Sequence, residues 1–344
     1  MVQISNQKSH DNPLVSVACI TYNHEKFIAQ AIESVLMQVT DFPVELVIGE
    51  DCSTDGTRAI VQEYAAKYPG VIRPLLPDKN LGMAKNYEAV RLACRGKYIA
   101  WLEGDDYWIS PKKLQLQVNL MEANPHFSMC GTKTRLSICD STGSEKETRL
   151  LAPGTIKEVY GLEEFLLGYT MHTTSMMLRN GVVEFPSWLS DIVMLRDTCV
   201  FALHADKGPV GYIDEVASCY RLHEGGIWTS KTAADQLQCN QIAIDLLDSH
   251  FQGRHKNLLM QREYGVMLAG VSDLFSKGLY REARMLFWQS AGRLVGEMPW
   301  KIFALGCGVY GGYQCRDLFH KLTMNLAIRT RLRQILSKIS CKNE

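Results

Sequence analysis

The sequence predicts an α/β protein in which a mostly parallel sheet is flanked by helices and followed by a helical C-terminal region. Short apolar runs alternate with helical patterns over the first ~125 residues, as in sheets that helices cover on both faces. Three of these runs are followed directly by polar loops. After Thr232 the sequence turns almost wholly helical. We therefore expect two domains, residues 1–230 and 231–344.

Strands are expected where apolar and β-branched residues cluster. The runs are VSVACI (15–20), ELVIG (45–49), the weaker VIRPLL (71–76) and YIAWLE (98–103). Between Thr170 and Trp228 short strands alternate with one helix. Residues 136–150 are polar and lack periodicity, so we expect a surface loop there.

Helices are expected between these strands. After Asn23, which can cap a helix, apolar residues recur at helical spacing: Phe27, Ile28, Ala31, Ile32, Val35 and Leu36. A second helix ends at Pro69-Gly70, residues 84–94 form a third, and Ser110-Pro111 opens a fourth.

The composition excludes several classes of protein. Lys+Arg and Asp+Glu are both 37, so no global basic field indicates a nucleic-acid partner. The eleven cysteines are odd in number and never spaced as C-x-x-C, which argues against a disulfide framework and for a reducing compartment. The polar N-terminus lacks the apolar core of a signal peptide, and no apolar run approaches the ~20 residues that span a bilayer. The sequence is thus typical of a cytoplasmic protein.

The loops TYNHE, EDCSTDG and EGDD each follow a strand directly. In parallel sheets ligands bind beyond the carboxyl ends of the strands. We therefore expect all three loops on one rim of the sheet, forming one site.

Three carboxylates, Glu103, Asp105 and Asp106, end the last of these strands within WLEGDDYW. Acidic clusters are often helix caps or solvated turns. Here, however, the acids end a buried strand, and Ser110 already marks the next helix. Divalent cations such as Mg²⁺ prefer one or two carboxylates plus substrate phosphates. The cluster therefore predicts a metal site that a phosphate group completes.

The other two loops suggest how a nucleotide is recognised. Asp51 ends its strand before the turn at Asp55-Gly56 begins, and its carboxylate can accept from a nucleobase N–H or a ribose hydroxyl. Thr21 and Tyr22 end the neighbouring strand, and Tyr22 can stack on a base.

Two further segments carry candidate residues. Asp191, Asp197 and His204 lie on or near one helix, although for any one of them a solvated helix face is the simpler interpretation. Arg221 and His223 precede a glycine-rich loop that can bring cations to a phosphate, as lid loops do. GCGVYG (306–311) matches G-x-G-x-x-G but has no room for a βαβ unit, so we reject it as a cofactor site.

Together, the strand–TYN–helix arrangement, VIGEDCSTDGT, GKYIAWLEGDDYW and YIDEVASCYRLHEGG resemble the family 2 inverting glycosyltransferases over residues 13–230. The resemblance implies the GT-A nucleotide-diphospho-sugar transferase fold, a nucleotide-diphosphate sugar as donor (a UDP-sugar favoured), and Mn²⁺ or Mg²⁺ as cofactor. The Q-x-x-R-W of processive members is absent, which indicates that one sugar is added. By analogy, the acceptor would be a saccharide or a lipid-linked saccharide of surface polysaccharide biosynthesis.

The resemblance also implies roles for individual residues. Asp105 and Glu103 would bind the metal in a D-x-D motif whose first Asp is Glu here. Asp197 would be the catalytic base, with Asp191 as the fallback. The nucleotide-binding residues would be Thr21, Tyr22, Glu25, Asp51, Asn80, Asn86, Glu103, Arg221 and His223.

Two alternatives remain open at this point. A nucleotidyltransferase would share the sheet and the metal but should carry a Gly-rich, basic loop where this chain has TYNHE. A non-catalytic nucleotide-sugar-binding relative would not need Asp51, Asp105 and a base. Residues 318–339 read as a basic amphipathic helix that either contacts the membrane surface peripherally or packs on the domain.

Overall fold

The computed structural model describes residues 2–6, 12–151, 156–168, 171–190, 192, 194–228 and 230–294. The chain divides into two compact units, of which the first ends at Ser230 and the second begins at Lys231. Asp191, the GCGVYG segment and the amphipathic segment 318–339 lie outside the described residues.

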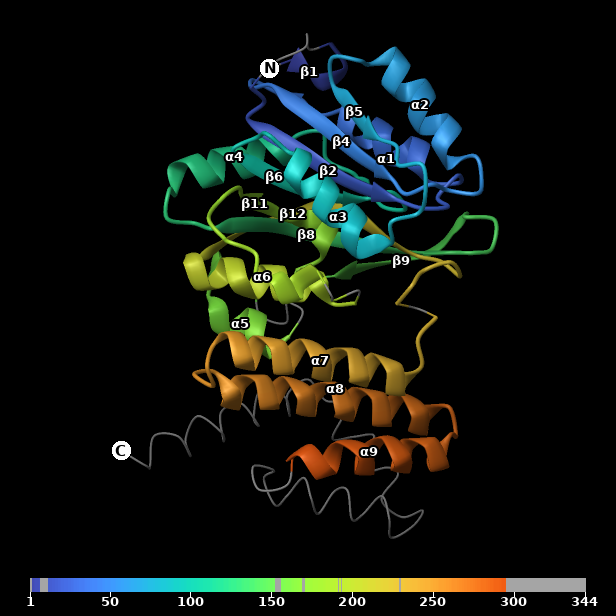
Figure 1. Cartoon of the computed structure of the whole chain (residues 1–344), viewed down its shortest axis with the longest axis vertical. Coiled ribbons are helices and arrows are strands. Elements are labelled where there is room, and N and C mark those ends of the chain that lie inside the picture. The colour runs from blue at the N-terminus through green and yellow to red at the C-terminus, as the bar shows by residue number, and fades with distance from the viewer. Residues whose placement is uncertain are drawn as a thin grey trace. The chain divides into compact units, whose positions relative to one another are not determined.

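The first unit is built on one large sheet (Figure 1). Its main strands are β2 (Val15–Thr21), β4 (Val44–Glu50), β5 (Ile72–Leu75), β6 (Tyr98–Glu103), β8 (Met129–Cys139), β10 (Val159–Tyr160), β11 (Met177–Arg179) and β12 (Val210–Leu222). Over the described residues they run in the order β10-β12-β8-β11-β6-β2-β4-β5. Two short strands join from the side: β7 (Tyr107–Trp108) pairs with β12, and β9 (Glu145–Leu151) pairs with β8. A separate ribbon pairs β1 (Val2–Gln3) with β3 (Val39–Thr40).

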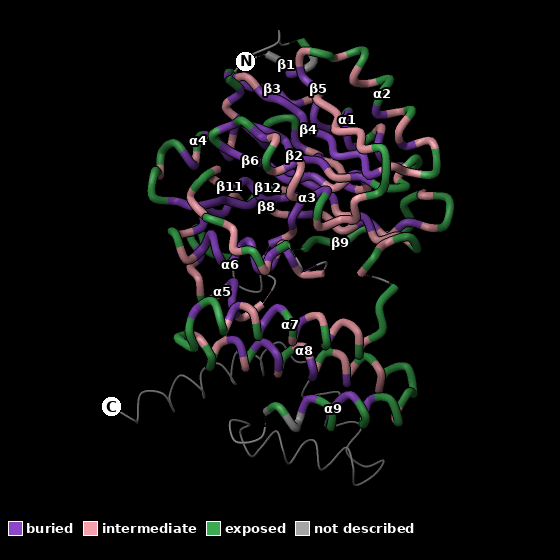
Figure 2. Tube along the Cα trace, viewed as in Figure 1, coloured by how far each residue is buried: buried purple, intermediate pink, exposed green. Residues whose placement is uncertain are grey.

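Most of the sheet is parallel, as the alternation of strands and helices predicts. The strands β6, β2, β4 and β5 pair in parallel, and so do β8 and β12. The short β11 lies between these two groups and is antiparallel to both of its neighbours. Every residue of β4 and all but Ile20 in β2 are buried (Figure 2), which explains why these strands are mostly apolar and show no strict polar alternation.

Six α-helices of the first unit are described. They are α1 (Ile28–Leu36), α2 (Thr57–Lys67), α3 (Met83–Ala93), α4 (Lys113–Ala123), α5 (Leu162–Leu167) and α6 (Arg196–Lys207). Short 3-10 segments cover Ile4–Asn6, Thr173–Ser175 and Ser187–Ser190. Helix α1 buries Ile28, Ala31, Ile32, Val35 and Leu36, the stripe that the sequence predicts.

Two local predictions are wrong. Asn23 does not cap α1: it adopts a φ of 57°, and its side-chain oxygen accepts from the Thr54 amide at 2.8 Å, so it joins two loops instead. Residues 136–150 do not form a loop, because they include the end of β8 and most of β9. Every residue of β9 is exposed, and a strand with no buried face has no apolar alternation to reveal it.

The described part of the second unit is helical. It comprises α7 (Ala233–His250), α8 (Lys256–Ser276) and α9 (Tyr280–Leu294), which form a layered stack (Figure 1). Thr232 and Asp235 cap α7 reciprocally. The three helices bury a small apolar cluster: Leu237, Met267, Val271, Ala283, Leu286 and Phe287. Over the described residues, no helix is both long and apolar enough to cross a membrane.

Candidate active site

The loops that follow β2, β4 and β6 meet at one rim of the sheet. The strand register sets Thr21 beside Glu50, and Ile20 beside Glu103. Because the three strands are parallel neighbours, their carboxyl ends face the same way. This is the convergence that the sequence predicts for TYNHE, EDCSTDG and EGDD.

Glu103, Asp105 and Asp106 form an acidic cluster at the end of β6. One carboxylate oxygen from each lies within 4.8 Å of the others. Asp106 is fully buried, and its Oδ1 accepts from the Arg221 amide at 2.9 Å, whereas its Oδ2 has no hydrogen-bond partner among the described residues. A buried carboxylate oxygen without a partner is costly. The cluster therefore has the oxygen ligands and the unmet charge that suit a divalent cation.

The pKa values of Glu103 and Asp106 also indicate uncompensated negative charge in the cluster. Burial raises the pKa of Glu103 to about 8, with a further contribution from the negative charges of Asp105 and Asp197. Burial also raises the pKa of Asp106 well above its ordinary value, assisted by the charges of Asp105 and Glu103. Three acids packed this closely hold more negative charge than their surroundings compensate.

Two histidines flank Asp105. The Nε2 atoms of His223 and His24 lie 3.1 Å and 3.7 Å from Asp105 Oδ2. Burial alone would raise the pKa of Asp105, but His24 and the hydrogen bond and charge of His223 lower it to about 2. His223 is a predicted site residue, whereas His24 is not, although it lies within the TYNHE loop.

The glycine of EGDD is required by this packing. A Cβ added at Gly104 would lie 2.5 Å from Thr21 Oγ1 and 3.0 Å from His24 Nδ1. These two side chains also contact each other, with 3.2 Å between Thr21 Oγ1 and His24 Nδ1. Thr21 is buried and packs against Gly104 and His24.

Arg221 joins β12 to the acidic loop. Its guanidinium donates to the Asp105 carbonyl and to Gln30 Oε1, and it lies between the rings of Phe27 and Tyr107, 5.0 Å and 4.3 Å from their centroids. Its positive charge is thereby held against the cluster in a buried position. Gln30, Phe27 and Tyr107 are supporting residues that the sequence gives no signal for, because their role depends on a strand more than 100 residues away.

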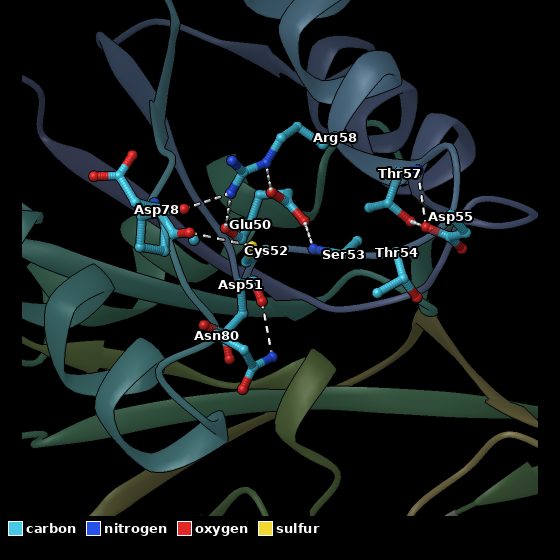
Figure 3. Close-up of polar contacts among 12 residues, drawn as sticks. Glu50, Asp51, Cys52, Ser53, Thr54, Asp55, Thr57, Arg58, Asp78 and Asn80 are labelled. Carbon is cyan, nitrogen blue, oxygen red and sulfur yellow. Dashed lines mark hydrogen bonds and ion pairs between the residues drawn. The ribbon is translucent and has the colours of Figure 1, made fainter.

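The loop after β4 is cross-linked by its own hydrogen bonds (Figure 3). Asp51 is buried, and its Oδ1 and Oδ2 accept from the amides of Leu81 at 2.6 Å and Gly82 at 3.0 Å. Asn80 Nδ2 donates to the Asp51 carbonyl at 2.8 Å. Asp51 and Asn80 thus hold the segment before α3 at the rim of the sheet.

The remaining predicted nucleotide-binding residues differ in burial and in hydrogen bonding. Asn86 is buried in α3 and donates to the Gly49 carbonyl at 2.9 Å. Glu25 accepts from the Gly56 amide at 2.8 Å and so ties the first loop to the start of α2. Tyr22 is 43% exposed at the rim, where its ring is available to a ligand.

Asp197 lies in the first turn of α6, as the count along the sequence predicts. Its Oδ1 accepts from the Thr198 amide at 2.8 Å and its Oδ2 from Thr173 Oγ1 at 2.9 Å. The negative charge of Asp197 contributes to the raised pKa of Glu103, so the two carboxylates lie near each other.

Comparisons with known proteins agree with this geometry. Residues 16–183 match the family described as glycosyl transferase family 2. Rv1520 of Mycobacterium tuberculosis is 35% identical over 219 residues, which span 63% of this chain and 61% of that protein. TuaG of Bacillus subtilis, whose name assigns it as a glycosyltransferase to teichuronic acid biosynthesis, is 30% identical over 64% of this chain and 84% of its own length.

Solved structures agree on the fold. A crystal structure of Staphylococcus aureus TarS 1-349 in complex with UDP-GlcNAc superposes with a TM-score of 0.59 at 20% identity, and the match covers 92% of this chain and 88% of that one. At this identity the likeness establishes the GT-A fold alone. The family match over residues 16–183 and the similarity to TuaG show that the chain belongs to glycosyl transferase family 2.

Proposed function

We propose that this chain is a metal-dependent inverting glycosyltransferase that moves one sugar from a nucleotide-diphosphate sugar to a hydroxyl of a saccharide or lipid-linked acceptor. The observation that carries the proposal is the acidic cluster on the same rim as the Asp51 loop, with Asp197 nearby. This arrangement supplies a place for a diphosphate, a place for a nucleoside and a base. A UDP-sugar is the favoured donor, in keeping with the ligand of the TarS structure.

Glu103, Asp105 and Asp106 are the residues that would hold Mn²⁺ or Mg²⁺. Their oxygen donors, and the Asp106 Oδ2 that lacks a partner among the described residues, fit a hard divalent cation. When bound, such a cation neutralises charge on a departing diphosphate. His223 and the buried guanidinium of Arg221 add positive charge beside the same loop.

Asp197 is the proposed base. It would accept the proton of the acceptor hydroxyl while that oxygen bonds to the anomeric carbon and the bond from that carbon to the diphosphate breaks. A single displacement of this kind inverts the anomeric configuration. Asp191 remains the alternative base, and residues 318–339 remain a proposed site of peripheral membrane contact at the cytoplasmic face.

Two other functions compete with this proposal. A nucleotidyltransferase would release pyrophosphate, and a non-catalytic relative would bind a nucleotide sugar without turning it over. The loop after β2 carries no glycine-rich basic segment, which speaks against a nucleotidyltransferase. The presence of Asp51, Asp105 and Asp197 speaks against a non-catalytic relative.

A panel of UDP- and GDP-sugars with Mn²⁺ tests the proposal. Thermal stabilisation by one of them, together with release of nucleoside diphosphate that EDTA stops, is the expected result. Stabilisation without release would indicate a binding protein, and pyrophosphate release would indicate a nucleotidyltransferase.

A further inference from the structure

The carboxylate of Asp197 is held at both oxygens, and the two donors differ in origin. Thr198 donates its amide from within α6, whereas Thr173 donates its hydroxyl from a turn that lies 24 residues earlier. A carboxylate only accepts, so the shared proton belongs to Thr173 Oγ1. Thr173 is therefore the contact through which a different element sets the direction of the Asp197 side chain.

The turn that carries Thr173 is held in place by hydrogen bonds and burial. The Ser175 amide and hydroxyl both donate to the His172 carbonyl, at 2.9 Å and 2.6 Å. Trp108 Nε1 donates to the Thr174 carbonyl at 2.9 Å, which ties the turn to β7 beside the acidic loop. Thr173 is only 6% exposed. A hydroxyl on such a support keeps a fixed direction, which is what orienting a partner requires.

The charges around Asp197 explain why a donor is needed there. Glu103 on β6 adds negative charge, and the phenols of Tyr87 on α3 and Tyr220 on β12 add no compensating positive charge. Arg196 is the adjacent cation, but its guanidinium is directed to the carbonyls of Ala84 and Leu189. The Thr173 hydroxyl is therefore the donor from outside α6 that holds the Asp197 carboxylate.

We propose that Thr173 is a positioning residue for Asp197, whose hydroxyl fixes the carboxylate in the direction from which it receives the acceptor proton. The inference rests on the proposed function, because it takes Asp197 as the base. It assigns a role to a residue whose hydroxyl donates to Asp197 from outside α6.

Thr174 offers a matched control. It is fully buried in the same turn, and its Oγ1 has no hydrogen-bond partner among the described residues. Thr173→Val and Thr174→Val each replace a hydroxyl by a methyl at nearly constant volume. Only the first change removes a contact to Asp197.

The variants are compared by UDP release from the UDP-sugar that the panel identifies, with Mn²⁺ and p-nitrophenyl glycosides as acceptors. We expect Thr173→Val to lower kcat by about ten- to a hundredfold, since misdirecting a catalytic group carries such a cost. Calorimetry should find the affinity for UDP and Mn²⁺ unchanged. Thr173→Ser should recover most of the activity, and Thr174→Val should behave as the unchanged protein.

Different results would contradict the positioning role of Thr173 and the assignment of Asp197 as the base. If Asp197→Asn slows transfer but Thr173→Val and Thr174→Val behave alike, the positioning role is wrong and the base assignment stands. If Asp197→Asn leaves transfer unchanged, the base assignment fails, and the positioning role fails with it. A crystal structure of Thr173→Val in which the Asp197 carboxylate keeps its place would also overturn the inference.

Discussion

The acidic loops after β4 and β6 are neighbours on one rim, but the protein compensates the carboxylates of the first loop much more fully than those of the second. After β4, Glu50 pairs with Arg58 and accepts from the Ser53 amide, and Asp51 accepts from two amides. After β6, Glu103 and Asp106 have raised pKa values, and Asp106 Oδ2 lacks a partner among the described residues. The acids of the first loop are compensated by the protein itself, whereas the second loop keeps a buried carboxylate oxygen that fits the proposed cation.

Asp55 and Glu103 show the physical basis of this difference. Burial would raise the pKa of Asp55, but hydrogen bonds from the Thr57 hydroxyl and from nearby amides outweigh burial and lower it. For Glu103, burial and two negative neighbours act in the same direction. Donors compensate the charge of Asp55, whereas Glu103 is left either to keep a proton or to bind a cation. Substitutions in the two loops should therefore have different effects on transfer and on stability.

The largest effect is expected at Asp105. Asp105→Ala removes the central carboxylate of the acidic cluster. Transfer should fall by at least about a thousandfold, because the metal and electrostatic stabilisation of the departing diphosphate is lost. Chelation by EDTA should have the same effect. Asp55→Asn is the control from the other loop: it should lower stability but leave the Mn²⁺ dependence of UDP release intact. Full activity of the protein in EDTA would contradict the metal assignment.

Asp197→Asn is expected to have the next largest effect. It keeps the shape of the side chain and removes its basicity, so transfer should fall by about 10²–10⁴-fold with donor binding intact. Asp191→Asn should do much less. Steady-state kinetics combined with UDP calorimetry checks both variants, and a reversal of the two results would make Asp191 the base.

A smaller effect is expected at Asp51, and it tests whether the loop after β4 is only structural. If Asp51 also reads the nucleobase, Asp51→Ala should weaken donor affinity by about 1–3 kcal/mol. The loss of acceptors for the Leu81 and Gly82 amides should lower the free energy of unfolding as well. Calorimetry and urea denaturation measure the two effects separately. An unfolding change with unaltered donor affinity would confine Asp51 to the structural role.

The smallest effect concerns pH and stability without metal. The folded-state pKa of Glu103 is about 8, above its ordinary value of 4.5. The folded protein therefore binds the extra proton more tightly, and the stability that Glu103 contributes is lost as pH rises from about 4.5 to 8. In EDTA, Glu103→Gln should be more stable than the unchanged protein at pH 8 but not at pH 4. Equal urea midpoints at both pH values would show that the carboxyl is already compensated.

The sequence was sufficient to predict the parallel part of the sheet and the rim on which the loops meet. Buried strands such as β4 are rich in apolar residues, and residues 50–57 and 103–106 are recognisable as polar, acidic segments at the strand ends. The exposed strand β9 was missed because no face of it is buried. His24 and Thr173 were missed because their roles depend on distances to Asp105 and Asp197 that only the folded chain sets.

The contact between Arg221 and the acidic loop has a consequence for synthesis of the protein. The Arg221 amide reaches Asp106 across 115 residues of sequence. At ~5–20 residues per second, a ribosome exposes the acids roughly 6–23 s before the strand that covers them. Strand β12 also pairs with β8, so the sheet and the site are complete only after that strand has emerged. The three carboxylates thus leave the ribosome well before the Arg221 amide that donates to Asp106, and the acidic loop reaches its final hydrogen bonding only after β12 has been made.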